Sequence, residues 1–171
     1  MLDKKVLELL NLQIQKEFYS AYLYLDFANY FEDAGLDGFA NWYRIQAQEE
    51  RDHAMLFLQY IQNNGASVKL LAVDEPEFNK ESHLSVLQET YKHKVYVTSS
   101  INDIYHIAND VKDYRTMQFL DWFIKEQGEE EKTADDIVKK FELFEKDAQA
   151  LYSLNAELGG RTYTPPSLVL D

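Results

Sequence analysis

Residues that interrupt helices are rare in this chain and gather at a few places. The 171 residues include only six glycines and three prolines. Between these breakers lie four long segments in which apolar residues recur at steps of three and four, the spacing that gives a helix one apolar face. The pattern therefore predicts an all-α protein.

The breakers also place the ends of the helices. We expect helices over residues 3–33, 37–64, 82–109 and 114–144, and a shorter fifth helix over residues 146–158. The short connections make the first and second helices, and the third and fourth, antiparallel pairs. Residues 66–81, which contain Pro76, are long enough to cross the length of a bundle. The expected architecture is a four-helix bundle with one long crossover.

Composition supports one globular domain, because 46% of the residues are apolar and 27% are charged. We expect this domain to cover residues 1–160. Residues 161–171, which contain Pro165 and Pro166, should form an irregular C-terminal tail.

Charge and cysteine content exclude several functions. Seventeen basic against thirty acidic residues give a formal charge of -13, which repels nucleic acid and anionic membranes and favours cations as partners. The absence of cysteine excludes disulfides, thiolate metal sites and iron–sulfur clusters. No apolar stretch approaches the roughly 18 residues of a membrane span, and no secretion signal is evident. We therefore expect a cytoplasmic protein.

Polar residues interrupt each predicted apolar row near the middle of its helix, so that they should meet at one height in the bundle. These residues are Glu17 in the first helix, Glu50 and His53 in the second, Lys94 in the third, and Gln127 and Glu130 in the fourth. Burying ionised carboxylates costs several kcal/mol each unless a counter-charge is close. Carboxylate oxygens with one imidazole suit iron or another first-row divalent ion. The alternative is a metal-free network of buried ion pairs that Lys94 neutralises.

A second acidic group lies one step round the same helices, at Glu49, Glu126 and Glu129. These side chains could hold a further, weaker metal on the concave side of an assembly. The alternative is a solvated acidic face, and the sequence leaves both open.

Four strings at these positions resemble the prokaryotic non-haem ferritins, and the resemblance covers about residues 1–160. The strings are Gln15–Ser20, Ala47–His53, Gln88–His93 and Glu126–Lys132. The resemblance implies a ferritin-like bundle in a hollow homo-oligomer of twenty-four subunits, without haem. It also implies a ferroxidase that oxidises ferrous iron with O2 or H2O2 and stores the ferric mineral inside.

The resemblance assigns a role to each matching residue. Glu17, Glu50 and His53 match the first iron site, and Glu130 with Gln127 nearby matches the second. A third site is matched by Glu49, Glu126 and Glu129. Tyr24 matches a tyrosine that can donate an electron, although core packing is the alternative for this residue.

One position departs from the family pattern. Lys94 stands where the family has a glutamate that binds the second iron. An ammonium group among carboxylates keeps its proton and cannot bind a metal. We therefore expect a single-iron centre with slower oxidation, or a non-catalytic subunit that only stores iron and nucleates mineral.

Other ferritin-like proteins fit less well. A rubrerythrin-like peroxidase would need cysteines, and haem binding would need a methionine at the subunit two-fold axis, for which Met55 is the nearest candidate. Tyr22, Tyr30 and Phe31 exceed what one bundle core can use, which favours burial between subunits. His83, His93 and His106 have no partner at ligand spacing in a buried row, so we expect them on the surface.

Overall fold

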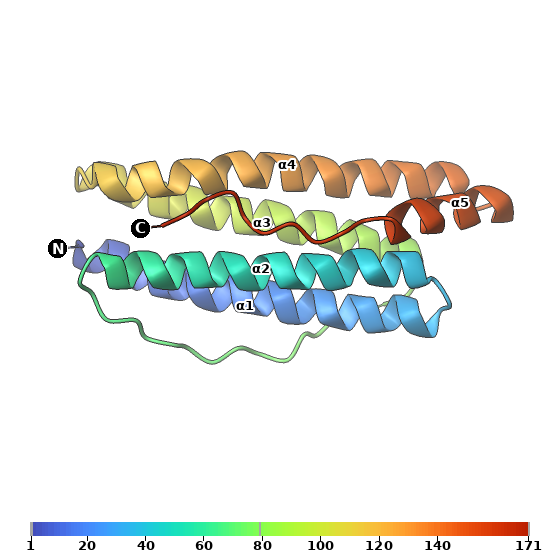
Figure 1. The fold of residues 1–171 in the computed structure, drawn as a ribbon, viewed down its shortest axis with the longest axis horizontal. Helices are drawn as coiled ribbons and strands as arrows, with labels where there is room; N and C mark the ends of the chain where they lie inside the picture. Colours follow the sequence, from blue (N-terminus) through green and yellow to red (C-terminus); the bar gives the residue numbers. More distant parts are fainter. Residues whose placement is uncertain (1, 79, 171) are drawn as a thin grey trace.

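The computed structural model describes residues 2–78 and 80–170, and these residues form five α-helices and no β-strand. The helices are α1 (Lys4–Asp33), α2 (Asp37–Asn63), α3 (His83–Asp110), α4 (Tyr114–Phe144) and α5 (Ala148–Gly159). Figure 1 shows four long helices packed lengthwise as a bundle, with α5 at one end. The all-α bundle with a short fifth helix is therefore confirmed.

Local hydrogen bonds fix the helix ends. The carboxylate of Asp3 caps α1 by accepting from the backbone N–H groups of Lys5 and Val6, and Ser82 caps α3 in the same manner. Helix α5 begins two residues later than expected, because Asp147 serves as its cap. Gly35 has φ +74°, in the left-handed region that glycine enters without strain, and so ends the α1–α2 turn.

The long crossover is confirmed. Residues 64–78 and 80–82 lie on the path from the end of α2 back along the bundle, so that α3 starts at the opposite end and runs parallel to α2 (Figure 1). Polar contacts help to hold this segment against α1. The backbone N–H of Lys69 donates to Asn11 Oδ1 at 2.6 Å, and Lys80 pairs with Asp26 at 2.5 Å.

Two apolar clusters fill the bundle, one toward each end. The first includes Phe27, Phe39 and Tyr43, and the second includes Ile14 and Phe57. The polar residues near the helix centres lie between these clusters and are themselves buried. They are therefore cut off from bulk water, which strengthens every electrostatic interaction among them.

Helix α5 packs against the start of α2. No neighbouring side chain caps α2, but Asn155 Oδ1 accepts from the backbone N–H groups of Gly38 and Phe39 at 2.9 and 3.2 Å. A Cβ atom on Gly38 would lie 1.7 Å from the carbonyl oxygen of Asn155, so the close approach requires glycine. The last helix thus supplies the cap that the second helix lacks.

The tail beyond α5 is irregular and runs back along the bundle (Figure 1). Trp122 Nε1 donates to Ser167 Oγ at 2.9 Å, and Gln59 Nε2 donates to the carbonyl oxygen of Leu170 at 3.0 Å. Residue 171 of the expected tail lies outside the described residues, and the division at residue 160 stays a prediction. None of the helices described here is long and apolar enough to span a membrane.

Two sequence expectations were wrong. His93 is 9% exposed and not a surface residue, and its Nε2 lies 2.7 Å from Ser20 Oγ. Its burial lowers its pKa to about 4. The cause of the error is rotational: α3 turns the face with Thr90 and His93 toward the core, whereas Tyr91 on the next face is 37% exposed. Phe31 is fully buried in the first apolar cluster and not surplus to it.

Candidate metal centre

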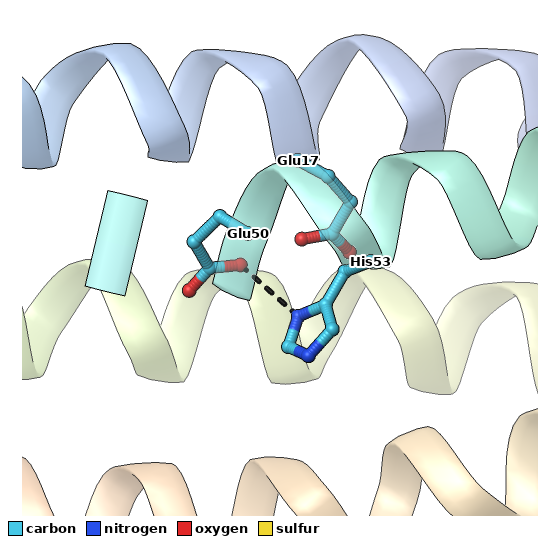
Figure 2. A group of neighbouring side chains, drawn as sticks. All are labelled: Glu17, Glu50 and His53. Carbon is cyan, nitrogen blue, oxygen red and sulfur yellow. Dashed lines mark hydrogen bonds and ion pairs between the residues drawn. The ribbon is translucent and has the colours of Figure 1, made fainter. Parts of the chain in front are cut away.

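Glu17, Glu50 and His53 converge in the middle of the bundle. Glu17 comes from α1, and Glu50 and His53 lie three residues apart on one face of α2. One ligand atom from each lies within 4.8 Å of the others, and all three side chains are buried (Figure 2). Two carboxylates and one imidazole at this separation form a donor set for a divalent first-row metal.

Glu17 has one bound oxygen and one free oxygen. Gln13 Nε2 donates to Glu17 Oε1 at 2.7 Å, whereas Glu17 Oε2 is buried without a hydrogen-bond partner. Buried polar atoms are rarely left without a partner, because the loss costs about 1–3 kcal/mol. Once Glu17 loses its proton, this unpaired oxygen beside His53 and Glu50 can serve as a ligand for a cation.

Lys94 fills the space on the other side of Glu50. Its Nζ lies 2.6 Å from Glu50 Oε1, 2.7 Å from Glu130 Oε2 and 2.6 Å from Gln46 Oε1. The lysine side chain is only 1% exposed. Glu50 therefore faces His53 with one oxygen and the Lys94 ammonium with the other.

Burial and neighbouring charges shift the ionisation of these groups. Burial, reinforced by the charge of Glu50, raises the pKa of Glu17 to about 8. Burial alone would raise the pKa of Glu50 and lower that of His53. The Lys94 ammonium and His53 instead hold the pKa of Glu50 below its usual range, and Glu50 raises the pKa of His53 to about 9.

Lys94 stays charged despite its burial. Desolvation by itself would lower the pKa of this amine, but Glu130 and then Glu50 raise it well above the usual value. The ammonium form therefore persists at neutral pH and has no lone pair for a metal.

The remaining residues expected near the second iron site make other contacts. Gln127 Nε2 donates to the carbonyl oxygen of Lys94 at 3.3 Å and to Thr98 Oγ1 at 3.2 Å. The ring of Tyr24 lies 4.8 Å from Lys94 Nζ, and its buried hydroxyl has no hydrogen-bond partner. Burial raises the pKa of Tyr24 well above its ordinary value.

The outer acidic residues do not share one environment. Both carboxylate oxygens of Glu49 accept from Arg161 Nη2, at 2.9 and 2.8 Å. The Arg161 guanidinium also lies over the ring of Trp42, at 5.3 Å. Glu129 is exposed and lies 3.6 Å from Lys125, while burial raises the pKa of the half-buried Glu126. A cation of the chain itself thus occupies the Glu49 position.

Sequence reasoning missed several residues of this centre. Gln13 and Gln46 each precede a glutamate of the centre by four residues, a helical spacing that could have identified them. Ser100 and Arg161 carried no such signal. Ser100 lies on α3, whereas Gln13, to which it donates a hydrogen bond, lies on α1. Arg161, which pairs with Glu49, lies in an irregular tail whose path has no periodic pattern.

Comparison with known proteins places this geometry in a family. The model of the ferritin-like domain family matches residues 7–144. The chain is 40% identical to a bacterial non-heme ferritin of Campylobacter jejuni over 152 residues, which are 89% of this chain and 91% of that protein. It is 36% identical to a Staphylococcus aureus bacterial non-heme ferritin over 95% of this chain and 98% of that one.

Solved structures agree with these relatives. A form of the Archaeoglobus fulgidus ferritin engineered to be closed superposes with a TM-score of 0.93 at 45% identity, covering 96% of this chain and all of that one. The open-pore ferritin of the same archaeon gives a TM-score of 0.92 at 45% identity, over 94% of this chain and 98% of that chain. Sequence, fold and site therefore agree, and the chain belongs to the ferritin-like family.

Proposed function

We propose that this protein stores iron, with ferrous iron as the substrate that binds at Glu17, Glu50 and His53. The ferric product would be kept as mineral inside a cage of twenty-four copies. The family match and the buried donor set support iron binding. The cage, the oxidant and the cytoplasmic location are parts of this proposal.

The position of Lys94 determines how many iron ions the centre can bind. Its ammonium group contacts both Glu50 and Glu130 at 2.6–2.7 Å, in the space where a second iron would need those carboxylates. A fixed positive charge there repels a divalent ion and occupies its ligands. We infer that each subunit binds one iron tightly within the bundle.

Charge balance supports the same number. Without metal, Glu50 and Glu130 are negative, Lys94 and His53 are positive, and Glu17 holds a proton, so the cluster is neutral. A divalent ion that displaces the protons of Glu17 and His53 leaves three negative and three positive charges, and the cluster remains neutral. A second divalent ion would leave two uncompensated positive charges in a buried site.

A one-iron centre slows the oxidation step. Reduction of O2 to peroxide takes two electrons, and one ferrous ion supplies only one. We therefore propose weak ferroxidase activity, in which a second electron comes from another iron outside the bundle centre. The alternative is a non-catalytic subunit that nucleates mineral, and the Lys94 ion pairs favour this candidate as well. A fast phase of O2 consumption at low iron distinguishes the first function from the second.

An anaerobic titration of the apo-protein with ferrous iron tests the proposed centre. We expect one tightly bound iron per subunit, counted by calorimetry and Mössbauer spectroscopy. Glu17→Gln should lose this binding, because it replaces the ligand whose Oε2 is unpaired. Glu8→Gln, an exposed carboxylate on the same helix, is the matched control and should bind like the wild type. Binding of two coupled irons per subunit would contradict the block by Lys94. Binding of no iron would refute the proposed centre.

Iron binding should also release protons. At pH 7 both Glu17, with a pKa of about 8, and His53, with a pKa of about 9, carry a proton in the metal-free protein. Metal binding requires both ligands without it, so close to two protons should leave per ion. The affinity should then fall by about 100-fold for each pH unit below 7. Calorimetry in buffers of different ionisation enthalpy measures this number, and release of no proton would contradict the assigned ligands.

A positive charge of the chain also limits metal binding at the outer acidic residues. Arg161 neutralises Glu49, so we propose that metal at Glu49, Glu126 and Glu129 binds weakly and competes with this guanidinium.

A further inference from the structure

A continuous chain of hydrogen bonds joins the bundle surface to Glu17. Lys16 Nζ donates to Ser100 Oγ at 2.5 Å, and Ser100 Oγ donates to Gln13 Oε1 at 2.8 Å. Gln13 Nε2 then donates to Glu17 Oε1 at 2.7 Å. Gln13 is fully buried and Ser100 is 7% exposed, so water does not compete with the two hydrogen bonds of the Gln13 side chain.

The chain has a direction that its first member sets. The ammonium of Lys16 can only donate, so Ser100 Oγ accepts from it and has its own hydrogen left for the next acceptor. That acceptor is the amide oxygen of Gln13. With its oxygen held by Ser100, Gln13 must present its NH2 group to Glu17. The lysine thus determines which end of a buried amide faces the carboxylate.

Lys16 itself is held in place. Its Nζ lies 5.0 Å from the centroid of the Tyr96 ring, an arrangement that favours the ammonium group. Lys16 and Gln13 lie on α1, whereas Ser100 and Tyr96 lie on α3. The chain therefore connects two helices and resists rotation of either one.

The two oxygens of Glu17 are made unequal by this arrangement. Oε1 is bound by Gln13, whereas Oε2 has no partner and is buried among the ligand atoms of Glu50 and His53. Partners in the shell around a ligand fix its orientation, and removing them typically costs 10–100-fold in metal affinity.

We propose that Gln13, Ser100 and Lys16 are positioning residues that present Glu17 Oε2 to the metal. None of the three touches the metal in this assignment. The inference rests on the proposed function, because it assumes that Glu17 binds the ion.

Binding of Co2+ to the metal-free cage tests the proposal, since Co2+ is not oxidised under these conditions and its visible spectrum reports ligand geometry. Ser100→Ala should weaken Co2+ binding by about 10–100-fold and alter the spectrum, with the number of ions per subunit unchanged. Ser100→Thr keeps the hydroxyl and should restore both affinity and spectrum. Ser99→Ala, on the exposed face of the same helix, is the matched control and should match the wild type.

Lys16→Met tests the direction of the chain. It removes the donor that forces Ser100 to accept, so the Gln13 amide can turn and present its oxygen to Glu17. We expect weaker Co2+ binding than in the wild type, with a smaller loss than in Ser100→Ala. Lys92→Met, which removes an exposed lysine paired with Glu89, should have no effect.

The outcomes separate the two proposals. If wild-type protein binds no Co2+ in the bundle, the proposed function fails. If the wild type binds Co2+ and Ser100→Ala binds it with equal affinity and the same spectrum, only the positioning role is refuted. Thermal unfolding of each variant shows whether the substitution disturbs the whole fold. A general loss of structure would lower the melting temperature of Ser100→Ala, whereas a positioning role predicts weaker Co2+ binding at an unchanged melting temperature.

Discussion

Replacing Lys94 by glutamate should raise the number of tightly bound ferrous ions from one to two per subunit. It should also accelerate the first phase of iron oxidation by about tenfold or more, which corresponds to about 1.4 kcal/mol or more in the activation free energy. The substitution removes the ammonium group that pairs with Glu50 and Glu130 and supplies a carboxylate in its place. Both carboxylates then become available to a second ion, and paired ions can deliver two electrons to O2 together.

The two effects are measured separately. Anaerobic titration counts the ions, and stopped-flow absorbance at two irons per subunit follows the formation of ferric product. Lys92→Glu makes the same change of charge on an exposed face of α3 and should leave both quantities unchanged. A count that stays at one, or an unchanged initial rate, would overturn the role assigned to Lys94.

Replacing Lys94 by methionine should destabilise the metal-free protein by about 3–5 kcal/mol, because it leaves buried carboxylates without their partner. Methionine has a similar length and fills the apolar part of the space, so the loss reports charge and not volume. Denaturant unfolding at fixed protein concentration measures the difference. Lys92→Met should change the free energy of unfolding by less than about 0.5 kcal/mol, since its pair with Glu89 is exposed.

Divalent metal should reverse much of this loss. An ion that binds the folded state stabilises it by an amount that grows with the logarithm of its affinity, and the variant no longer repels the ion with the Lys94 ammonium. The increase in stability on adding Co2+ should therefore be larger in Lys94→Met than in the wild type. A smaller increase would show that Lys94 does not act through its charge.

Most of the fold was predictable because it depends on residues close together in sequence. Glycines at the turns marked the helix ends, and the long connection around Pro76 marked the crossover. Glu17, Glu50 and His53 were predictable as neighbours, because each interrupts an apolar row at mid-helix. The position of each residue along its helix was sufficient for these predictions.

Rotation about a helix axis was not predictable to the same degree. A step of one residue turns a side chain by about 100°, so a small error in rotation changes which residues of α3 face the core. The structure buries His93 together with Thr90, although we expected His93 on the surface. Contacts between distant elements, such as Ser100 with Gln13 or Arg161 with Glu49, depend on this rotation and on the path of the tail. No periodic pattern encodes them.

The cap that Asn155 provides for α2 has a consequence for the order of assembly during synthesis. All residues of the α1–α2 hairpin have been synthesised once residue 63 leaves the ribosome. The N–H groups of Gly38 and Phe39, however, bind Asn155, which lies 117 and 116 residues further along the chain. Such a distant contact closes late, because the intervening chain must be ordered first. Until then we expect this end of the hairpin to fray, because its N–H groups lack the Asn155 acceptor. The final helix therefore completes the start of α2, and a chain that ends before Asn155 leaves these two N–H groups without that cap.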